Sequence, residues 1–139
     1  VTGRHNYLNV AAAALAAQTL GASDAEIEAG ATRFRPLEHR LQFVHENNGV
    51  RFFNDSVATT PASAVAALTS FPLRRAIMLV GGYDKKLPYD ELGATIVSRA
   101  KHAVIYGAAA DAIRSHQEHE AAEQEKGLRG LLKNMFGKK

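Results

Sequence analysis

The chain has 139 residues, of which 46% are hydrophobic, so it can form a buried core of ordinary size. Its net charge of +3 is concentrated in residues 126–139, which hold five basic residues and no acidic one, and the slightly acidic remainder predicts no nucleic-acid partner. The lack of cysteine excludes a disulfide scaffold and thiolate catalysis. Without a long apolar run or a secretion signal the expected location is the cytoplasm, and the absent initiator Met is typical of a piece of a longer protein.

The first part of the chain predicts two helices. Alanine-rich residues 6–20 have helical apolar spacing, and Gly21 is a typical residue after a helix C-terminus. Ser23 or Asp24 is expected to cap a second helix that runs to about Thr32.

A β-hairpin is predicted next, because the spacing of apolar residues changes from helical to alternating at residue 41. Two alternating runs, residues 41–46 and 50–53, flank Asn48-Gly49. An Asn-Gly pair between such runs is the strongest short-range hairpin signal.

The remainder alternates helices with short apolar strands. Pro61 stands at the start of an expected helix over 62–71, and the later elements are a strand 76–80, a helix 89–99, a strand 103–106 and a helix 108–125. This order predicts an α/β fold, a Rossmann-like open sheet made of the hairpin plus parallel strands and flanked by helices. The small number of strands indicates a truncated sheet.

Polar residues gather at the start of the first helix and on both sides of the hairpin. Asn6 and Asn9 share one face of the first helical turn and could face a phosphate or base, although Asn6 or His5 could simply cap the helix. If the hairpin closes through Asn48-Gly49, Arg40 and Asp55 come near each other at its open end. They could form an ordinary surface pair or hold a nucleotide.

A third polar cluster follows the strand 76–80. Gly81-Gly82 would let a ligand approach the backbone, and Lys85 would supply a positive charge for a carboxylate or phosphate. An ordinary glycine turn with solvated lysines is the alternative.

Taken in order, the motifs G-x-H-N-x-x-N, H-R, N-D-S-x-A-T and G-G-x-D-K resemble the Mur ligases, ATP-dependent enzymes of peptidoglycan precursor synthesis. The resemblance covers residues 2–110 and is closest to the members that add D-glutamate to UDP-N-acetylmuramoyl-L-alanine. It implies that residues 1–36 are the helical end of the central ATPase domain and residues 37–125 an incomplete, Rossmann-like C-terminal domain. Pro36 stands at that junction, and residues 126–139 form a basic amphipathic tail.

The resemblance also implies a role for each matched residue. Asn6, Asn9, Arg40 and Asp55 match nucleotide-binding positions, Thr59 and Lys85 match positions that contact D-glutamate, and His39 matches the histidine beside the arginine. His39 and Lys85 are therefore the expected catalytic residues. The implied cofactors are ATP and Mg²⁺, the implied partners are the missing N-terminal and central domains, and no resident metal site is expected.

Three departures from the family pattern stand out. Val57 occupies a position where many members have lysine, and the sequence contains no phosphate-binding loop. The family segment L-S-P-x-x-x-S-x-D-x-F, which completes the glutamate pocket, is also absent. We therefore expect the chain alone to be inactive as a ligase.

The last part of the chain leaves several readings open. His116, His119 and Glu120 are close enough in sequence for a metal site, but a solvated helix face is favoured. The amphipathic tail could pack on the sheet, lie weakly on an anionic membrane surface, or be unstructured. The alternatives to a D-glutamate-adding ligase are another Mur ligase or a folylpolyglutamate synthetase-type ligase, and a non-catalytic binding module.

Overall fold

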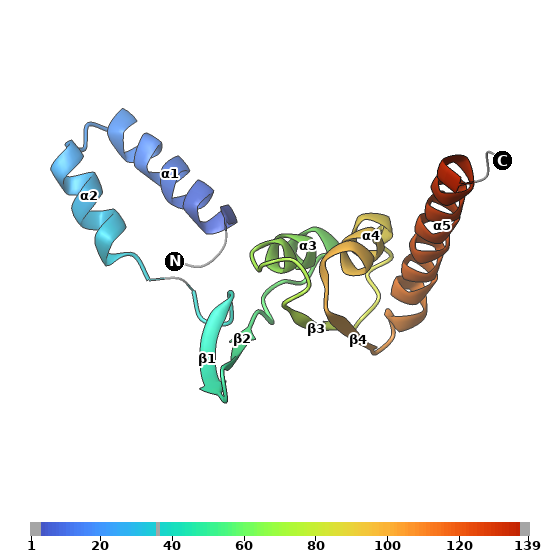
Figure 1. Ribbon diagram of the computed structural model, residues 1–139. Helices are drawn as coiled ribbons and strands as arrows, with labels where there is room; N and C mark the ends of the chain where they lie inside the picture. Colours follow the sequence, from blue (N-terminus) through green and yellow to red (C-terminus); the bar gives the residue numbers. More distant parts are fainter. Residues whose placement is uncertain (1–3, 36, 137–139) are drawn as a thin grey trace. The chain divides into compact units, whose positions relative to one another are not determined.

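A computed structural model of the chain describes the backbone of residues 4–35 and 37–136, and the side chains of 6–35 and 37–131 (Figure 1). The chain forms two compact units, Val1–Thr59 and Thr60–Lys139. Pro36, the predicted domain junction, lies outside the described residues, as do the last three residues of the tail. The domain boundaries given above therefore stay predictions.

The first unit begins with two helices, α1 (Arg4–Thr19) and α2 (Asp24–Arg33). Ser23 is the N-cap of α2, because its hydroxyl accepts from the Glu26 N–H and the Glu26 carboxylate accepts from the Ser23 N–H at 2.9 Å. The predicted helix pair is confirmed. Because α1 already begins at Arg4, Asn6 lies inside its first turn and is not its cap.

The hairpin of the first unit consists of the antiparallel strands β1 (Gln42–Asn47) and β2 (Val50–Asn54). Asn48 and Gly49 between them have φ of 49° and 77°. Positive φ at both central residues is what a type I′ turn requires, and Asn-Gly tolerates it best. The prediction of a hairpin closed by Asn48-Gly49 is confirmed.

The second unit contains five elements: α3 (Pro61–Thr69), β3 (Ile77–Gly81), α4 (Asp90–Arg99), β4 (His102–Tyr106) and α5 (Ala110–Phe136). β3 and β4 pair in parallel, which confirms the mixed α/β class. In the described part of the chain, the hairpin and this parallel pair are two separate two-stranded sheets. Within the described residues β1 pairs with β2 and β3 pairs with β4, so the expected hairpin and the expected parallel strands are both present.

The core of the second unit lies on one face of the parallel pair. Leu92 and Ile113 are almost completely buried, and Met78, Val80 and Ile105 pack against them from the strands. In Figure 1, α3 and α4 lie beside each other along the strands. The alternate strand residues point away from this core and are exposed: Ile77, Leu79, Val104 and Tyr106.

Helix α5 continues from Ala110 to Phe136 without interruption, across the predicted boundary at residue 125. The reading of the tail as unstructured is therefore wrong through Phe136. Leu128 and Leu131 are exposed, so these two leucines do not pack on the sheet. None of the described helices is both long and apolar enough to cross a lipid bilayer.

Candidate functional site

The start of the hairpin has a constrained backbone. His39 and Leu41 have φ of 61° and 42°, in the left-handed region that side chains other than glycine rarely occupy. Such residues persist where surrounding bonds hold them, and they are common at functional sites. Three residues of the hairpin and its exit loop, Gln42, Asn54 and Val57, bond to His39.

Asp55 holds the backbone beside Arg40. Its Oδ1 accepts a hydrogen bond of 2.9 Å from the N–H of Leu41, across the open end of the hairpin. Arg40 and Asp55 thus come near each other as predicted, but among the described residues they do not form an ion pair. The surface Arg–Asp pair considered from sequence is corrected: the partner of the carboxylate is the buried backbone of Leu41.

Asn54 is the residue of this site that the sequence analysis did not assign. Its Oδ1 accepts from the Ser56 N–H at 3.0 Å, which leaves its Nδ2 facing His39 Nδ1 at 2.9 Å. The N-D-S motif could have predicted the bond to Ser56, because an Asn side chain often accepts a hydrogen bond from the N–H two residues later. The partner across the hairpin follows only from the strand register.

The two asparagines of α1 differ in environment. Asn6 is 5% exposed and takes part in an interaction, whereas Asn9 is exposed to solvent. Both lie on the first turns of α1, as the spacing predicted. Their nucleotide-binding role stays a prediction.

The two threonines after the hairpin, Thr59 and Thr60, have different structural roles. Thr60 is the N-cap of α3, where its Oγ1 accepts from the Ser63 N–H at 3.2 Å and Pro61 takes the first helical position. Thr59 is exposed and is not needed for the cap. It is therefore available for the predicted contact with an amino-acid substrate.

Glycines join the carboxyl ends of β3 and β4. The Gly82 N–H donates to Tyr106 at 3.1 Å, and the Gly82 carbonyl accepts from Ala109 at 3.0 Å. Gly81 has φ of 149°, and a Cβ there would lie 1.8 Å from the Tyr106 carbonyl oxygen. Only glycine permits this close approach, at the edge where open parallel sheets bind ligands.

The loop after β3 is ordered by Asp84. Its carboxylate accepts from the Lys86 ammonium at 2.7 Å, the Lys86 N–H at 2.8 Å and the Tyr89 hydroxyl at 3.2 Å. The Lys86 hydrogen bonds hold the pKa of Asp84 below its ordinary value. Burial raises the pKa of Tyr89, which keeps its hydroxyl protonated as a donor.

Lys85 lies between these paired residues and remains exposed. Among the described residues its ammonium has no carboxylate within ion-pair distance. The neighbouring Lys86 is the lysine neutralised by Asp84. Lys85 therefore keeps an available charge near the carboxyl end of β3, as its predicted role requires.

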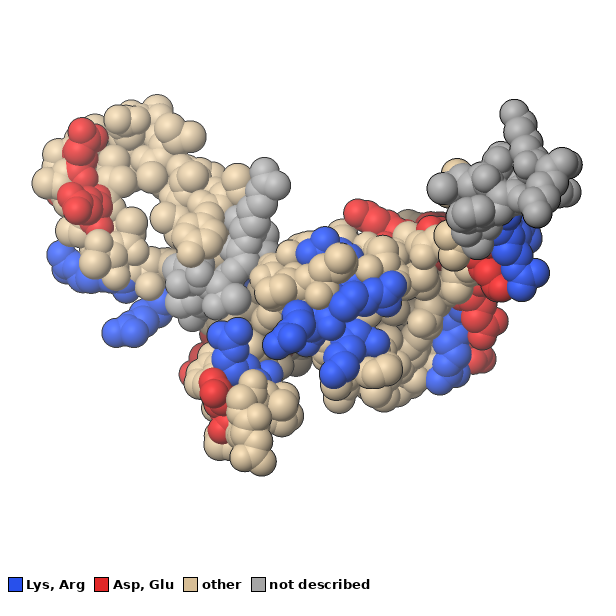
Figure 2. All heavy atoms as spheres, in the orientation of Figure 1, with Lys and Arg blue, Asp and Glu red and all other residues tan. Residues whose placement is uncertain are grey.

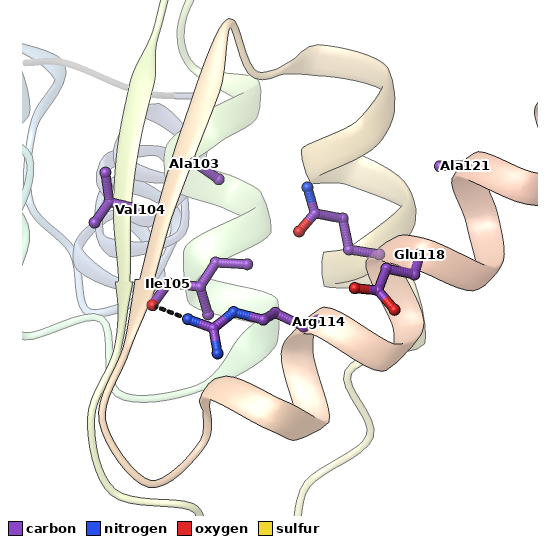
Figure 3. Close-up of a pocket in the computed structure, with 7 residues that line it drawn as sticks. Ala103, Val104, Ile105, Arg114, Glu118 and Ala121 are labelled. Atoms are coloured by element: carbon purple, nitrogen blue, oxygen red, sulfur yellow. Dashed lines mark hydrogen bonds between the residues drawn. The ribbon is translucent and has the colours of Figure 1, made fainter.

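A hollow of about 510 Å³ lies elsewhere in the second unit, between β4 and α5. Figure 3 shows Arg114 reaching across it to the carbonyl oxygen of Ile105, a bond of 2.9 Å. The hollow is lined by Ala103, Val104, Ile105, Arg114, Gln117, Glu118 and Ala121. It contains none of the predicted site residues, so we do not assign it to the chemistry.

The possible metal cluster on the last helix does not form. His116 Nδ1 lies 3.1 Å from Asp90 Oδ1 on α4 and so joins two helices. Among the described residues, no group of three His, Asp or Glu side chains is arranged to hold a metal ion. His119 and Glu120 belong to a largely exposed helix face.

The structure thus brings His39, Arg40 and Asp55 together within the first unit. Lys85 belongs to the second unit, and its contact with a glutamate substrate stays a prediction.

The sequence matches the family model described as Mur ligase, glutamate ligase domain, over residues 39–135. The chain therefore belongs to the Mur ligase family, and its fold is that of this glutamate ligase domain. The match extends beyond residue 110, where the recognisable motifs end.

Curated relatives agree with this assignment. A UDP-N-acetylmuramoylalanine–D-glutamate ligase of Acetivibrio thermocellus is 40% identical over 91% of this chain, and one of Solibacter usitatus is 45% identical over 81%. A UDP-N-acetylmuramoyl-L-alanine–L-glutamate ligase of Xanthomonas campestris pv. campestris is 39% identical over 70%. The matches cover 27%, 25% and 21% of these relatives, so the chain spans about a quarter of their length.

Proposed function

We propose that this chain is the C-terminal part of an ATP-dependent ligase that joins glutamate to UDP-N-acetylmuramoyl-L-alanine in peptidoglycan precursor synthesis. The observation that carries the proposal is the family match over residues 39–135, supported by relatives named for this reaction. We expect such a ligase to act in the cytoplasm, because its substrates are nucleotides and nucleotide-linked sugars.

The hairpin supplies the nucleotide contacts in this proposal. The guanidinium of Arg40 has no ion pair among the described residues, so it is available for phosphate oxygens. Asp55 is oriented by the Leu41 N–H through one carboxylate oxygen, which leaves the other for a ribose or base. Asn6 and Asn9 are assigned to the same nucleotide, and His39 positions this segment through Asn54.

The amino-acid contacts come from Thr59 and Lys85. An exposed ammonium suits a glutamate carboxylate, and a threonine hydroxyl can donate to a carboxylate oxygen. ATP with Mg²⁺ would supply the phosphoryl group that converts the acceptor carboxylate into an acyl phosphate. The glutamate amine then attacks this carbonyl and phosphate leaves, so Thr59 and Lys85 would hold and orient the amine donor.

The residues present fit part of an ATP site. Arg40 and Asp55 suit phosphate and sugar groups, but the sequence contains no G-x-x-x-x-G-K-[ST] loop and the described residues form no metal cluster. The remaining nucleotide and metal contacts would come from a region present in the longer relatives. The isolated chain should therefore show no glutamate-dependent ATP hydrolysis.

A chimera tests the proposal directly. The matched C-terminal region of the Acetivibrio thermocellus relative is replaced by this chain, and ADP release is measured with UDP-N-acetylmuramoyl-L-alanine and glutamate. We expect release that depends on both substrates. Arg40→Ala and Lys85→Ala should each lower the rate roughly 100-fold, as loss of a charge-stabilising group does. A folded chimera without activity would contradict the proposal and favour the non-catalytic module.

Matched controls and the two glutamate enantiomers sharpen the test. Arg75→Ala and Lys101→Ala remove exposed charges outside the proposed site and should leave the rate unchanged. Separate reactions with D-glutamate and L-glutamate decide between the two specificities found among the relatives. D-glutamate is the expected substrate.

A further inference from the structure

Helix α5 is packed against its unit in its first part and exposed to solvent in its second part. Its first part is packed: Ile113 is 1% exposed, and Arg114 and His116 bond to β4 and α4. From Ala121 to Leu131 every residue is exposed. The second part of α5 thus extends beyond the core of its own unit, and Figure 1 shows the helix continuing past α4.

Packing within the described chain does not explain this helical segment. A short helix without tertiary contacts is marginally stable in water, and Gly127 and Gly130, which have open space around them, lower its propensity further. Two side-chain pairs support it, Lys126 with Glu123 and Arg129 with Glu125, each at 2.7 Å. Surface pairs of this kind contribute little, so a binding partner would stabilise the segment.

The segment has one apolar side and a basic remainder. Leu128 and Leu131 are 58% and 62% exposed, three residues apart. The sequence continues this spacing through Leu132, Met135 and Phe136, while residues 126–139 contain five basic residues and no acidic one. The acidic residues of α5 all precede Lys126, and Figure 2 shows both signs of charge along the helix.

We propose that residues 126–136 form a peripheral membrane-binding helix that lies on anionic phospholipid. Leu128 and Leu131 would enter the boundary between headgroups and acyl chains, and the lysine and arginine side chains would contact the phosphates. The proposal goes beyond the ligase function and does not depend on it.

The alternative binding partner of this helix is the exposed sheet face of a second copy of the chain, because Leu79 and Val104 on that face are also exposed. Charge disfavours it. Arg75 lies two residues before β3 and Lys101 directly precedes β4, so the basic helix would meet like charges at that sheet. An anionic surface attracts the same residues.

Vesicle co-sedimentation of the full chain tests the proposal. We expect binding to phosphatidylcholine vesicles that contain phosphatidylglycerol, weak or no binding to pure phosphatidylcholine, and release by salt. The double variant L128E/L131E should reduce binding roughly tenfold or more, because it removes apolar contact and adds like charge.

The matched control is L20E/L73E, which makes the same change at two leucines exposed elsewhere. It should bind vesicles as the unmodified chain does, and unchanged circular dichroism without vesicles shows that both variants fold. Failure of the full chain to bind anionic vesicles would overturn the proposal, as would equal binding by L128E/L131E. Light scattering that shows a dimer lost in L128E/L131E, without vesicle binding, would assign the helix to a second copy.

Discussion

The imidazole Nδ1 of His39 lies 2.9 Å from the amide Nδ2 of Asn54, on the far side of the hairpin base. The Ser56 N–H fixes the amide orientation by donating to Asn54 Oδ1, so the nitrogen that faces His39 is a donor. Nδ1 must then accept, and the ring proton of neutral His39 lies on Nε2. Nε2–H has no hydrogen-bond partner among the described residues, so it is the group that His39 can offer to a substrate.

This tautomer can be observed. Nitrogen NMR of the ring should show an unprotonated Nδ1 and a protonated Nε2 for neutral His39. Asn54→Ala removes the donor and should mix the two tautomers, while Ser56→Ala keeps the backbone N–H and should not. A dominant Nδ1–H form in the unmodified chain would contradict the assignment.

Asp55 has a structural task that can be separated from nucleotide binding. Asp55→Ala leaves the buried Leu41 N–H without its acceptor, which should lower the free energy of unfolding by about 1–3 kcal/mol. Asp55→Asn keeps a carbonyl oxygen and should lose less stability. Urea denaturation measures both, and an Asp55→Ala variant as stable as the unmodified chain would show that the bond to Leu41 contributes nothing.

Because Gly81 lies close to the Tyr106 backbone, we expect substitution of Gly81 to destabilise the fold more than substitution of Gly82. Gly81→Ala would place a Cβ 1.8 Å from the Tyr106 carbonyl oxygen, and should destabilise the second unit by roughly 3 kcal/mol or more. Gly82→Ala is also strained, at φ 111°, but its Cβ meets nothing within 4 Å. Its cost should be about 1–2 kcal/mol. Thermal unfolding compares the melting temperatures of the two variants. Gly81→Ala reports backbone strain together with the steric clash, whereas Gly82→Ala reports backbone strain alone.

The Asp84 loop should be sensitive to acid. Because the pKa of Asp84 is lower in the folded chain than its ordinary value of 3.8, its ionised form stabilises the fold above that value. This contribution is lost as the pH falls below 3.8 and through the lower folded pKa. Asp84→Asn should remove this part of the acid dependence of the melting temperature.

Tyr89→Phe is the control for the same loop. It keeps the buried ring but loses the hydroxyl donor to Asp84. Since the Lys86 hydrogen bonds are the main cause of the lowered pKa, this variant should retain most of the acid dependence. If Tyr89→Phe abolishes it as fully as Asp84→Asn does, the assignment to Lys86 is wrong.

The sequence alone determined the local elements and the family. The Asn48-Gly49 turn, the Ser23 cap and the Pro61 helix start were all predictable, because each depends on backbone preferences of adjacent residues. The motif order identified the Mur ligase family because it combines residue types that local structure does not require.

Only the tertiary structure decided which distant groups are partners. Asp55 bonds to Leu41 instead of pairing with Arg40, and Lys86 rather than Lys85 is neutralised by Asp84. The exposure of the second part of α5 was likewise beyond the sequence. The physical reason is that these outcomes depend on strand register and packing across the fold, which the spacing of residues along the chain does not specify.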